Sequence, residues 1–303
     1  MIEKYKELFE CKEEFLLPSG RACPGCGGGI MTRLWTKATG GKNVVFGGIG
    51  SCGTSTTGMF PIGNMTRIPA IAALLGSNGP TLSGMREALN IRGMQDATVM
   101  ALDGDGGAAD IGFGAYSAMV ERGHKVAVCV NDNEGYSATG GQRSGLTSLK
   151  AWTRTTHKGK DRPPKHLPFL LMAQDIPYTA TANIGYPDDM YRKMKKALDQ
   201  KNQPSLIQVL CPCIPNWKYE PRKVVEVSRL ATETGMYPLY EYEKGSFRRT
   251  VFIKKKKPLQ EYLKLQGRFD HVTEEDIKEM QAYIDALDRK IDGYIRMYSV
   301  EIF

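Results

Sequence analysis

Acidic and amide side chains occur directly after two apolar segments of the sequence. Segment 97–102 runs into the letters DGDGG, and segment 126–130 runs into NDNEG. Glycine amides at a turn that opens a helix favour phosphate oxygens, whereas carboxylates there repel them. Mg²⁺ resolves this conflict, because it binds carboxylate and other oxygen ligands and bridges them to a substrate phosphate. The pattern therefore predicts that Asp105, the Asn133 amide oxygen and the Gly135 carbonyl hold a metal ion that holds a diphosphate.

Cysteines form a second candidate centre. The sequence has seven, and an odd number with no recognisable export signal argues against a disulfide framework. Cys23 and Cys26 form a glycine-rich Cys-x-x-Cys motif, while Cys52 and the Cys211/Cys213 pair follow apolar segments. Four thiolates suit either a [4Fe-4S] cluster or zinc, and spacing alone leaves Cys211 and Cys213 equal as ligands.

Alternating strand-like and helical segments must position these residues. The alternation predicts a mostly parallel α/β sheet with helices on both faces, whose ligands bind at the carboxyl ends of the strands. We expect strands at 43–46, 97–102, 125–130, 178–181 and 205–210. We expect helices at 82–90, 112–122, 168–174 and 187–199. After Tyr219 the pattern changes to a helix, a hairpin-like segment and a last helix capped by Thr273 and Asp276.

The composition is that of a globular protein with an ample core, since 41% of the 303 residues are hydrophobic. The N-terminal letters MIEKYKELFECKEEF are charged, and no later segment approaches about eighteen consecutive apolar residues. We therefore expect a cytoplasmic protein without a membrane span. The net charge of +8 is concentrated in segment 248–257, which could face an acidic partner, an anionic cofactor or solvent. Aromatic residues do not interleave with its lysines, which argues against nucleic acid.

The ordered motifs resemble one family. GDG at 104–106 followed by NDN at 131–133 is similar to the thiamine diphosphate-binding fold. Together with ACPGCG, SCGTSTTGMFP, NDNEGYSATGGQRSG, PCIPNW and EYLKLQGRFDHVTEEDI, these motifs resemble the beta subunits of the 2-oxoacid:ferredoxin oxidoreductases, most closely the pyruvate synthase type. The resemblance implies that residues 1–220 bind thiamine diphosphate and carry the cluster ligands. Residues 221–303 are then a C-terminal helical extension for subunit contacts and docking.

The resemblance also implies a role for particular residues. It selects Cys213 over Cys211 and gives the [4Fe-4S] ligands as Cys23, Cys26, Cys52 and Cys213. It gives the Mg²⁺ ligands as Asp105, Asn133 and Gly135. The expected cofactor-binding residues are Gly50, Ser51, Gly104, Asp105, Gly106, Gly107, Asn133, Gly135, Tyr136, Ser137, Ala138 and Thr139. Thr139 and Gln142 are the expected catalytic residues.

The implied reaction is the oxidative decarboxylation of a 2-oxoacid, with thiamine diphosphate as the electron sink. Electrons leave singly through the cluster to ferredoxin or an electron-transfer subunit, and coenzyme A takes the acyl group. The glutamate that activates the cofactor lies on the alpha chain in multi-subunit members. The expected partners are therefore alpha-, gamma- and delta-type subunits, without which this chain is inactive. Because ferredoxin is usually acidic, segment 248–257 is a candidate docking site.

One position departs from the family pattern. Pyruvate enzymes of the family usually carry Asn where this chain has Ala138, and that amide contacts the substrate. The substrate is accordingly pyruvate or a different 2-oxoacid, such as an aryl, a branched-chain acid or oxalate. Two other interpretations stay open at this point: a non-redox thiamine diphosphate decarboxylase or carboligase, and a zinc-stabilised structural module in which GDG is a turn.

Overall fold

One sheet of eight strands organises the chain. The computed structural model describes residues 12–17, 22–41, 43–49, 66–200 and 203–298. In chain order the strands are β1 Val44–Ile49, β2 Ala70–Ala72, β3 Thr98–Gly104, β4 Val126–Asp132, β5 Tyr178–Asn183, β6 Ser205–Leu210, β7 Tyr240–Glu243 and β8 Ser246–Arg249. Their order across the sheet is β2-β1-β3-β4-β6-β5-β7-β8. The first six are parallel, and β7 and β8 add an antiparallel hairpin next to β5. The predicted mostly parallel sheet is confirmed.

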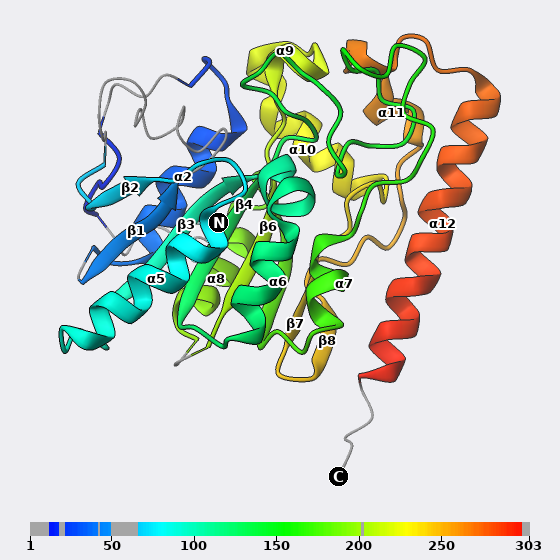
Figure 1. Ribbon diagram of the computed structural model, residues 1–303. Helices are drawn as coiled ribbons and strands as arrows, with labels where there is room; N and C mark the ends of the chain where they lie inside the picture. Colours follow the sequence, from blue (N-terminus) through cyan, green and yellow to red (C-terminus); the bar gives the residue numbers. More distant parts are fainter. Residues whose placement is uncertain (1–11, 18–21, 42, 50–65, 201–202, 299–303) are drawn as a thin grey trace.

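Helices cover both faces of this sheet, as predicted (Figure 1). Successive strand residues point to opposite faces, so Val99 and Ala101 of β3 pack against one helix layer while Met100 and Leu102 pack against the other. The first layer contains α5 Asn78–Ile91, α6 Phe113–Glu121 and α7 Leu167–Met172. The second contains α2 Gly27–Ala38, α8 Pro187–Leu198 and α10 Val224–Glu233. Cys129 of β4 is buried in the same hydrophobic cluster as Met100 and Leu102, so it is a core residue.

The C-terminal segment, from residue 214 onward, adds helices to the second layer and along one edge of the molecule. Its shorter helices are α9 Ile214–Trp217, η3 Pro221–Lys223, α11 Leu259–Leu263 and η4 Gly267–Phe269. Helix α12, Glu274–Met297, begins at the predicted Thr273–Asp276 capping box and lies along the edge of the molecule in Figure 1. Its stripe of Met280, Ile284, Leu287 and Ile291 packs within this chain.

Several elements were not predicted from the sequence, among them helices α2, α9 and α11 and strand β2. Helix α2 starts directly after Cys26 with three glycines, and β2 is a partly exposed strand of three residues. The boundary proposed at residue 220 stays a prediction, although β7 and β8 continue the sheet of the preceding residues. Within the described ranges, no helix is both long and apolar enough to cross a membrane.

Candidate functional site

Three strand ends bring the candidate residues together. In the sheet Gly104 of β3 pairs with Asn131 of β4, and Asp132 of β4 pairs with Leu210 of β6. Because these strands are parallel, the turns that follow them lie at one edge of the sheet. The turn after β3 continues into η2, Gly107–Ile111, as expected for a phosphate-binding turn. The structure therefore collects the DGDGG, NDNEG and CPC motifs at a single edge.

The three proposed Mg²⁺ ligands converge there. One terminal atom of the Asn133 amide lies 3.3 Å from Asp105 Oδ1 and 2.7 Å from the Gly135 carbonyl oxygen. Adjacent ligands of an octahedral ion with bonds of about 2.1 Å are roughly 3 Å apart, so the spacing fits Mg²⁺. No group of three or more His, Cys, Asp and Glu side chains in the described ranges is placed to hold a metal. At Asp105 the other two proposed ligands are an amide oxygen and a backbone carbonyl.

Asp105 is buried in an acidic environment. Its pKa is raised to about 7, chiefly by burial and to a smaller extent by the neighbouring Glu134 and Asp110 carboxylates, while hydrogen bonds from Ser144 and the Gly106 amide oppose the increase. The Ser144 hydroxyl donates to Asp105 Oδ2 at 2.5 Å. A cation next to this carboxylate would favour its ionised form. The chemistry of the site therefore suits a divalent ion better than a protonated acid.

Close packing explains the glycines of the turn. A Cβ added to Gly106 would lie 2.4 Å from the Tyr136 ring, and one added to Gly107 would lie 2.4 Å from Asp103 Oδ1. The Tyr136 hydroxyl donates to the Gly106 carbonyl at 3.2 Å and to Asp110 at 3.3 Å. Tyr136 therefore lies against the turn, and its role in cofactor binding stays a prediction. No larger side chain fits at either glycine without movement of its neighbour.

The expected catalytic residues lie next to each other in the following loop. The Thr139 hydroxyl donates to Gln142 Oε1 at 2.6 Å, and Gln142 Nε2 donates to the Thr139 carbonyl at 2.9 Å. Ala138 and Thr139 are exposed. Both positions are thus accessible to a ligand or a partner chain.

The cysteines approach the same edge. Burial raises the pKa of Cys213, the Cys26 and Cys23 thiols raise it further, and hydrogen bonds from Ser137 and Asn216 lower it. The three thiols are therefore close enough to influence one another. Cys23 is exposed, whereas Cys26 and Cys213 are partly buried.

The first turn of helix α2 donates hydrogen bonds that favour the thiolate form of Cys26. The backbone amides of Gly28 and Gly29, in the first turn of the helix, hydrogen-bond to its sulfur and so lower its pKa, although burial dominates and raises it. Cys211 differs, because it is buried and belongs to the core. Cys52, Gly50 and Ser51 lie outside the described residues.

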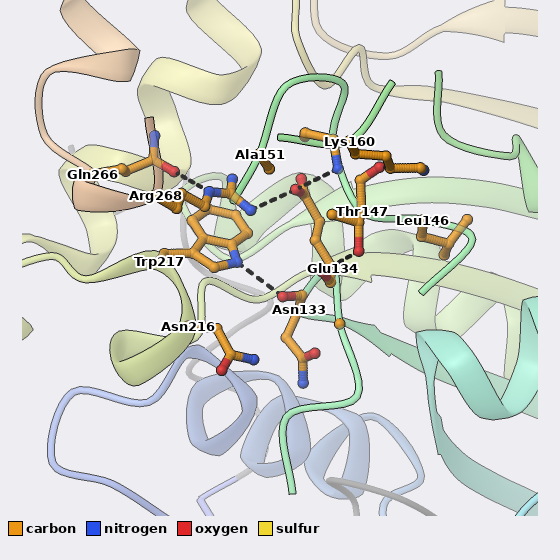
Figure 2. A network of polar contacts seen from close by, with 12 residues as sticks. Asn133, Glu134, Leu146, Thr147, Ala151, Lys160, Asn216, Trp217, Gln266 and Arg268 are labelled. Atoms are coloured by element: carbon orange, nitrogen blue, oxygen red, sulfur yellow. Dashed lines mark hydrogen bonds and ion pairs between the residues drawn. The ribbon is translucent and has the colours of Figure 1, made fainter. Parts of the chain in front are cut away.

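A buried polar network lies behind the loop that carries Asn133 and Gly135, here called the metal loop (Figure 2). This network was not predicted from the sequence. Arg268, from the C-terminal segment, pairs with Glu134 at 2.6 Å, and its guanidinium lies 3.6 Å from the centre of the Trp217 indole ring. Trp217 donates to the Asn133 carbonyl at 2.9 Å. Buried Lys160 donates to the Gly145 and Thr147 carbonyls and fixes the loop that faces Glu134.

A cavity of about 230 Å³ opens beside this network, lined among others by Glu134, Trp152, Asn216 and Arg268. Only the letters GRFD around Arg268, within a motif of the resemblance, could have drawn attention to the pair.

Comparisons with known proteins identify relatives of this chain. The family model described as "Thiamine pyrophosphate enzyme, C-terminal TPP binding domain" matches residues 48–209, and thiamine pyrophosphate is another name for thiamine diphosphate. The pyruvate synthase subunit PorB of Methanocaldococcus jannaschii is 43% identical over 286 residues, covering 90% of this chain and 95% of that protein. The ketoisovalerate oxidoreductase subunit VorB of Pyrococcus horikoshii is 37% identical over 284 residues, covering 90% of each.

A solved structure shows the same fold. The 2-oxoglutarate:ferredoxin oxidoreductase from Magnetococcus marinus, with 2-oxoglutarate, coenzyme A and succinyl-CoA bound, has a TM-score of 0.57 and 19% identity to this chain. The match covers 71% of this chain and 79% of that chain. From the strand-end motifs, the matched binding domain and relatives aligned over nine-tenths of its length, the chain belongs to the family of thiamine diphosphate-binding beta subunits of the 2-oxoacid:ferredoxin oxidoreductases.

Proposed function

We propose that this chain holds Mg²⁺–thiamine diphosphate at the carboxyl ends of β3 and β4 and carries a [4Fe-4S] cluster beside it. One hydroxyl group supports this proposal, because it contacts a proposed ligand of each centre. Ser137 Oγ lies 2.9 Å from the Asn133 amide and also hydrogen-bonds to Cys213. Asn216 Nδ2, in helix α9 after Cys213, donates to the same hydroxyl at 2.6 Å. A cluster ligand and a metal ligand are therefore separated by a single side chain.

The roles of the residues follow from their positions. Asp105, Asn133 and the Gly135 carbonyl hold the ion, while the glycine amides of the turn receive the diphosphate oxygens. When bound, thiamine diphosphate supplies the nucleophilic carbon and the electron sink for decarboxylation. Cys23, Cys26, Cys52 and Cys213 hold the cluster that accepts single electrons. This use of four thiolates distinguishes the proposal from a non-redox decarboxylase and from a zinc module.

The substrate is a 2-oxoacid, and coenzyme A accepts the acyl group. Relatives include subunits of both pyruvate synthase and ketoisovalerate oxidoreductase. Ala138 is exposed in the loop next to Thr139, and its methyl group offers no hydrogen bond to a substrate carboxylate or carbonyl. We infer that the pocket accepts a 2-oxoacid other than pyruvate, such as a branched-chain or aryl acid.

The partners are the other subunits of the complex and an electron acceptor of the ferredoxin kind. Most of the basic segment 248–257 is neutralised by acidic residues of the same chain, as in the pairs of Arg249 with Asp288 and of Lys257 with Glu233. Lys254 and Lys255 are exposed, and no acidic side chain of the described ranges pairs with them. These two lysines are the part of the segment that remains available to an acidic partner.

Metal and cofactor analysis of the complex purified without oxygen tests the proposal. The wild type should contain iron, sulfide and thiamine diphosphate, and should reduce a viologen dye with a 2-oxoacid and coenzyme A. Asp105→Asn should lower the affinity for thiamine diphosphate by at least about 100-fold and keep its iron, since a direct ligand is lost. Cys213→Ser should lose iron, whereas the matched core variant Cys129→Ala should keep both centres. Zinc without iron would contradict the proposal, and a preference for pyruvate of tenfold or more would contradict the inferred substrate.

A further inference from the structure

A buried ion pair joins the C-terminal segment to the residue between two proposed metal ligands. Arg268 Nη1 lies 2.6 Å from Glu134 Oε2, and the two side chains are only 2% and 6% exposed. Arg268 also donates to Gln266 Oε1 at 2.9 Å (Figure 2). A further guanidinium nitrogen of Arg268 donates to the Tyr262 hydroxyl at 3.1 Å. Its guanidinium is therefore fixed on three sides. Glu134 lies between Asn133 and Gly135, so its conformation decides where both of them point.

The backbone of Glu134 requires such support. Its φ angle is +59°, in the left-handed region that disfavours residues with a side chain. Its amide donates to Asp132 Oδ1 at 3.2 Å, and its carbonyl accepts from the Thr147 hydroxyl at 2.6 Å. Its carboxylate also accepts from the Ser148 amide at 3.1 Å. Contacts of the side chain and the backbone together hold a conformation that the residue would not adopt alone.

Trp217 links the pair to the metal loop a second time. Its ring lies under the Arg268 guanidinium, and its Nε1 donates to the Asn133 carbonyl at 2.9 Å. The cation therefore orders two consecutive residues of the loop, one directly and one through the indole.

We propose that Arg268 is a positioning residue, which holds Glu134 in its left-handed conformation and thereby sets the affinity of this chain for Mg²⁺–thiamine diphosphate. The inference rests on the proposed function, because it concerns the same site. A loop that is already ordered loses little conformational entropy when the ligand binds. A disordered loop would lose conformational entropy on binding, and this loss would weaken the affinity.

Two double variants test this directly. Removing only one partner leaves a buried unpaired charge, so both partners are replaced, in Glu134→Ala/Arg268→Met and in Glu134→Gly/Arg268→Met. The alanine variant should bind thiamine diphosphate at least about tenfold more weakly than the wild type, because alanine disfavours a positive φ. The glycine variant should recover most of that loss, because glycine adopts a positive φ freely. The two variants lose the same side-chain contacts, so their difference reports the backbone alone.

Equilibrium dialysis gives the dissociation constant, using the assembled complex after a chelator has removed its cofactor and with Mg²⁺ at a fixed concentration. Tryptophan fluorescence gives a second readout, since Trp217 contacts the loop. The control is Asp189→Ala/Lys193→Met, which removes another buried pair, 2.6 Å apart with side chains 4% and 2% exposed, in helix α8. This control should lower thermal stability without changing the dissociation constant.

The outcomes are distinguishable. If the wild-type complex bound no thiamine diphosphate, the proposed function would fail and not merely this inference. Wild-type affinity in the alanine variant, or equal affinities of the alanine and glycine variants, would overturn the positioning role. If the double variants do not fold, Arg268→Lys replaces them, since it keeps the charge and loses the fork of donors. Its dissociation constant should rise several-fold, and an unchanged value would overturn the inference.

Discussion

Ser144 shows how one buried hydroxyl orients a candidate ligand. It donates to Asp105 Oδ2, and this leaves Oδ1 directed toward the Asn133 amide. The Leu146 amide donates to the same hydroxyl at 3.2 Å, so the serine is itself held in place. Partners of metal ligands of this kind fix the ligand's orientation. The surroundings of Asp105, and not its own rotamer alone, therefore set the direction in which its carboxylate would face an ion.

We expect Ser144→Ala to weaken the binding of Mg²⁺–thiamine diphosphate by about 10- to 100-fold, because Asp105 loses the donor that orients it. Titration of the cofactor-free complex with thiamine diphosphate measures the effect. Ser205→Ala is the matched control: Ser205 is also buried and donates to the Ala197 carbonyl, but it begins β6 at the opposite edge of the sheet. Equal affinities of the Ser144 variant and this control would show that Ser144 does not orient the ligand.

At the scale of single residues, the polar residues that follow strand ends could be predicted from the sequence. The buried residues that hold those side chains and their loop in place could not. Asp105 and Asn133 are marked by the glycines and amides around them. The Glu134–Arg268 pair has no such mark. Its members are 134 positions apart in the sequence, and glutamate and arginine are residue types that usually lie on the surface. Only the folded chain shows that both are buried.

Helices α5 and α6 cross at a glycine. A Cβ at Gly79 would lie 2.5 Å from the Ala115 carbonyl oxygen and 3.1 Å from the Tyr116 amide nitrogen, whereas a Cβ at Gly84 would meet nothing within 4 Å. Both glycines lie in α5. Tyr116 in turn donates to Asp103 Oδ2 at 2.8 Å, next to the cofactor turn. The close approach of the helices therefore bears on the site as well as on stability.

Gly79→Ala should lower the free energy of unfolding by about 1–3 kcal/mol, because the methyl group forces the helices apart. Gly84→Ala should raise it by about 0.5–1 kcal/mol, because alanine restricts the unfolded chain and favours the helix. Chemical denaturation of the two variants measures the difference. Equal effects of the two substitutions would refute a packing requirement at Gly79.

Elements with a regular burial pattern were predictable, and the others were not. The strands β3 to β6 are buried on both faces, so their apolar runs identify them. β2 has only three residues, of which two are exposed, and its sequence carries no such signal. Helix α2 begins with glycines, which have a low helix propensity, and packing of Met31 and Trp35 in the core stabilises it instead.

For the whole molecule, His166, at the start of α7, joins that helix to the C-terminal helix α12. Its ring stacks with Tyr283 of α12 and packs near Phe169 of α7, and its Nε2 lies 3.2 Å from the Tyr283 hydroxyl. Burial, and to a smaller extent the charge of Lys290, lowers its pKa to about 4. Above the unfolded value of about 6.5 the neutral imidazole stabilises the fold, and this contribution is lost as the pH falls toward 4.

The wild type should therefore lose up to about 2 kcal/mol more of its free energy of unfolding between about pH 7 and about pH 5 than His166→Gln does. Urea unfolding at the two pH values measures this difference. The glutamine removes the titratable group and keeps a polar side chain of similar reach, so the acidic residues contribute equally to both proteins. Parallel pH profiles would show that His166 is not responsible.

The position of Arg268 in the sequence has a consequence for biosynthesis. Synthesis proceeds from the N-terminus, so the loop that carries Asn133 and Gly135 leaves the ribosome 134 residues before the arginine that braces Glu134. A nascent chain that already contains every strand of the sheet still lacks this brace. The loop around Glu134 can therefore gain this brace only after Arg268 has been synthesised.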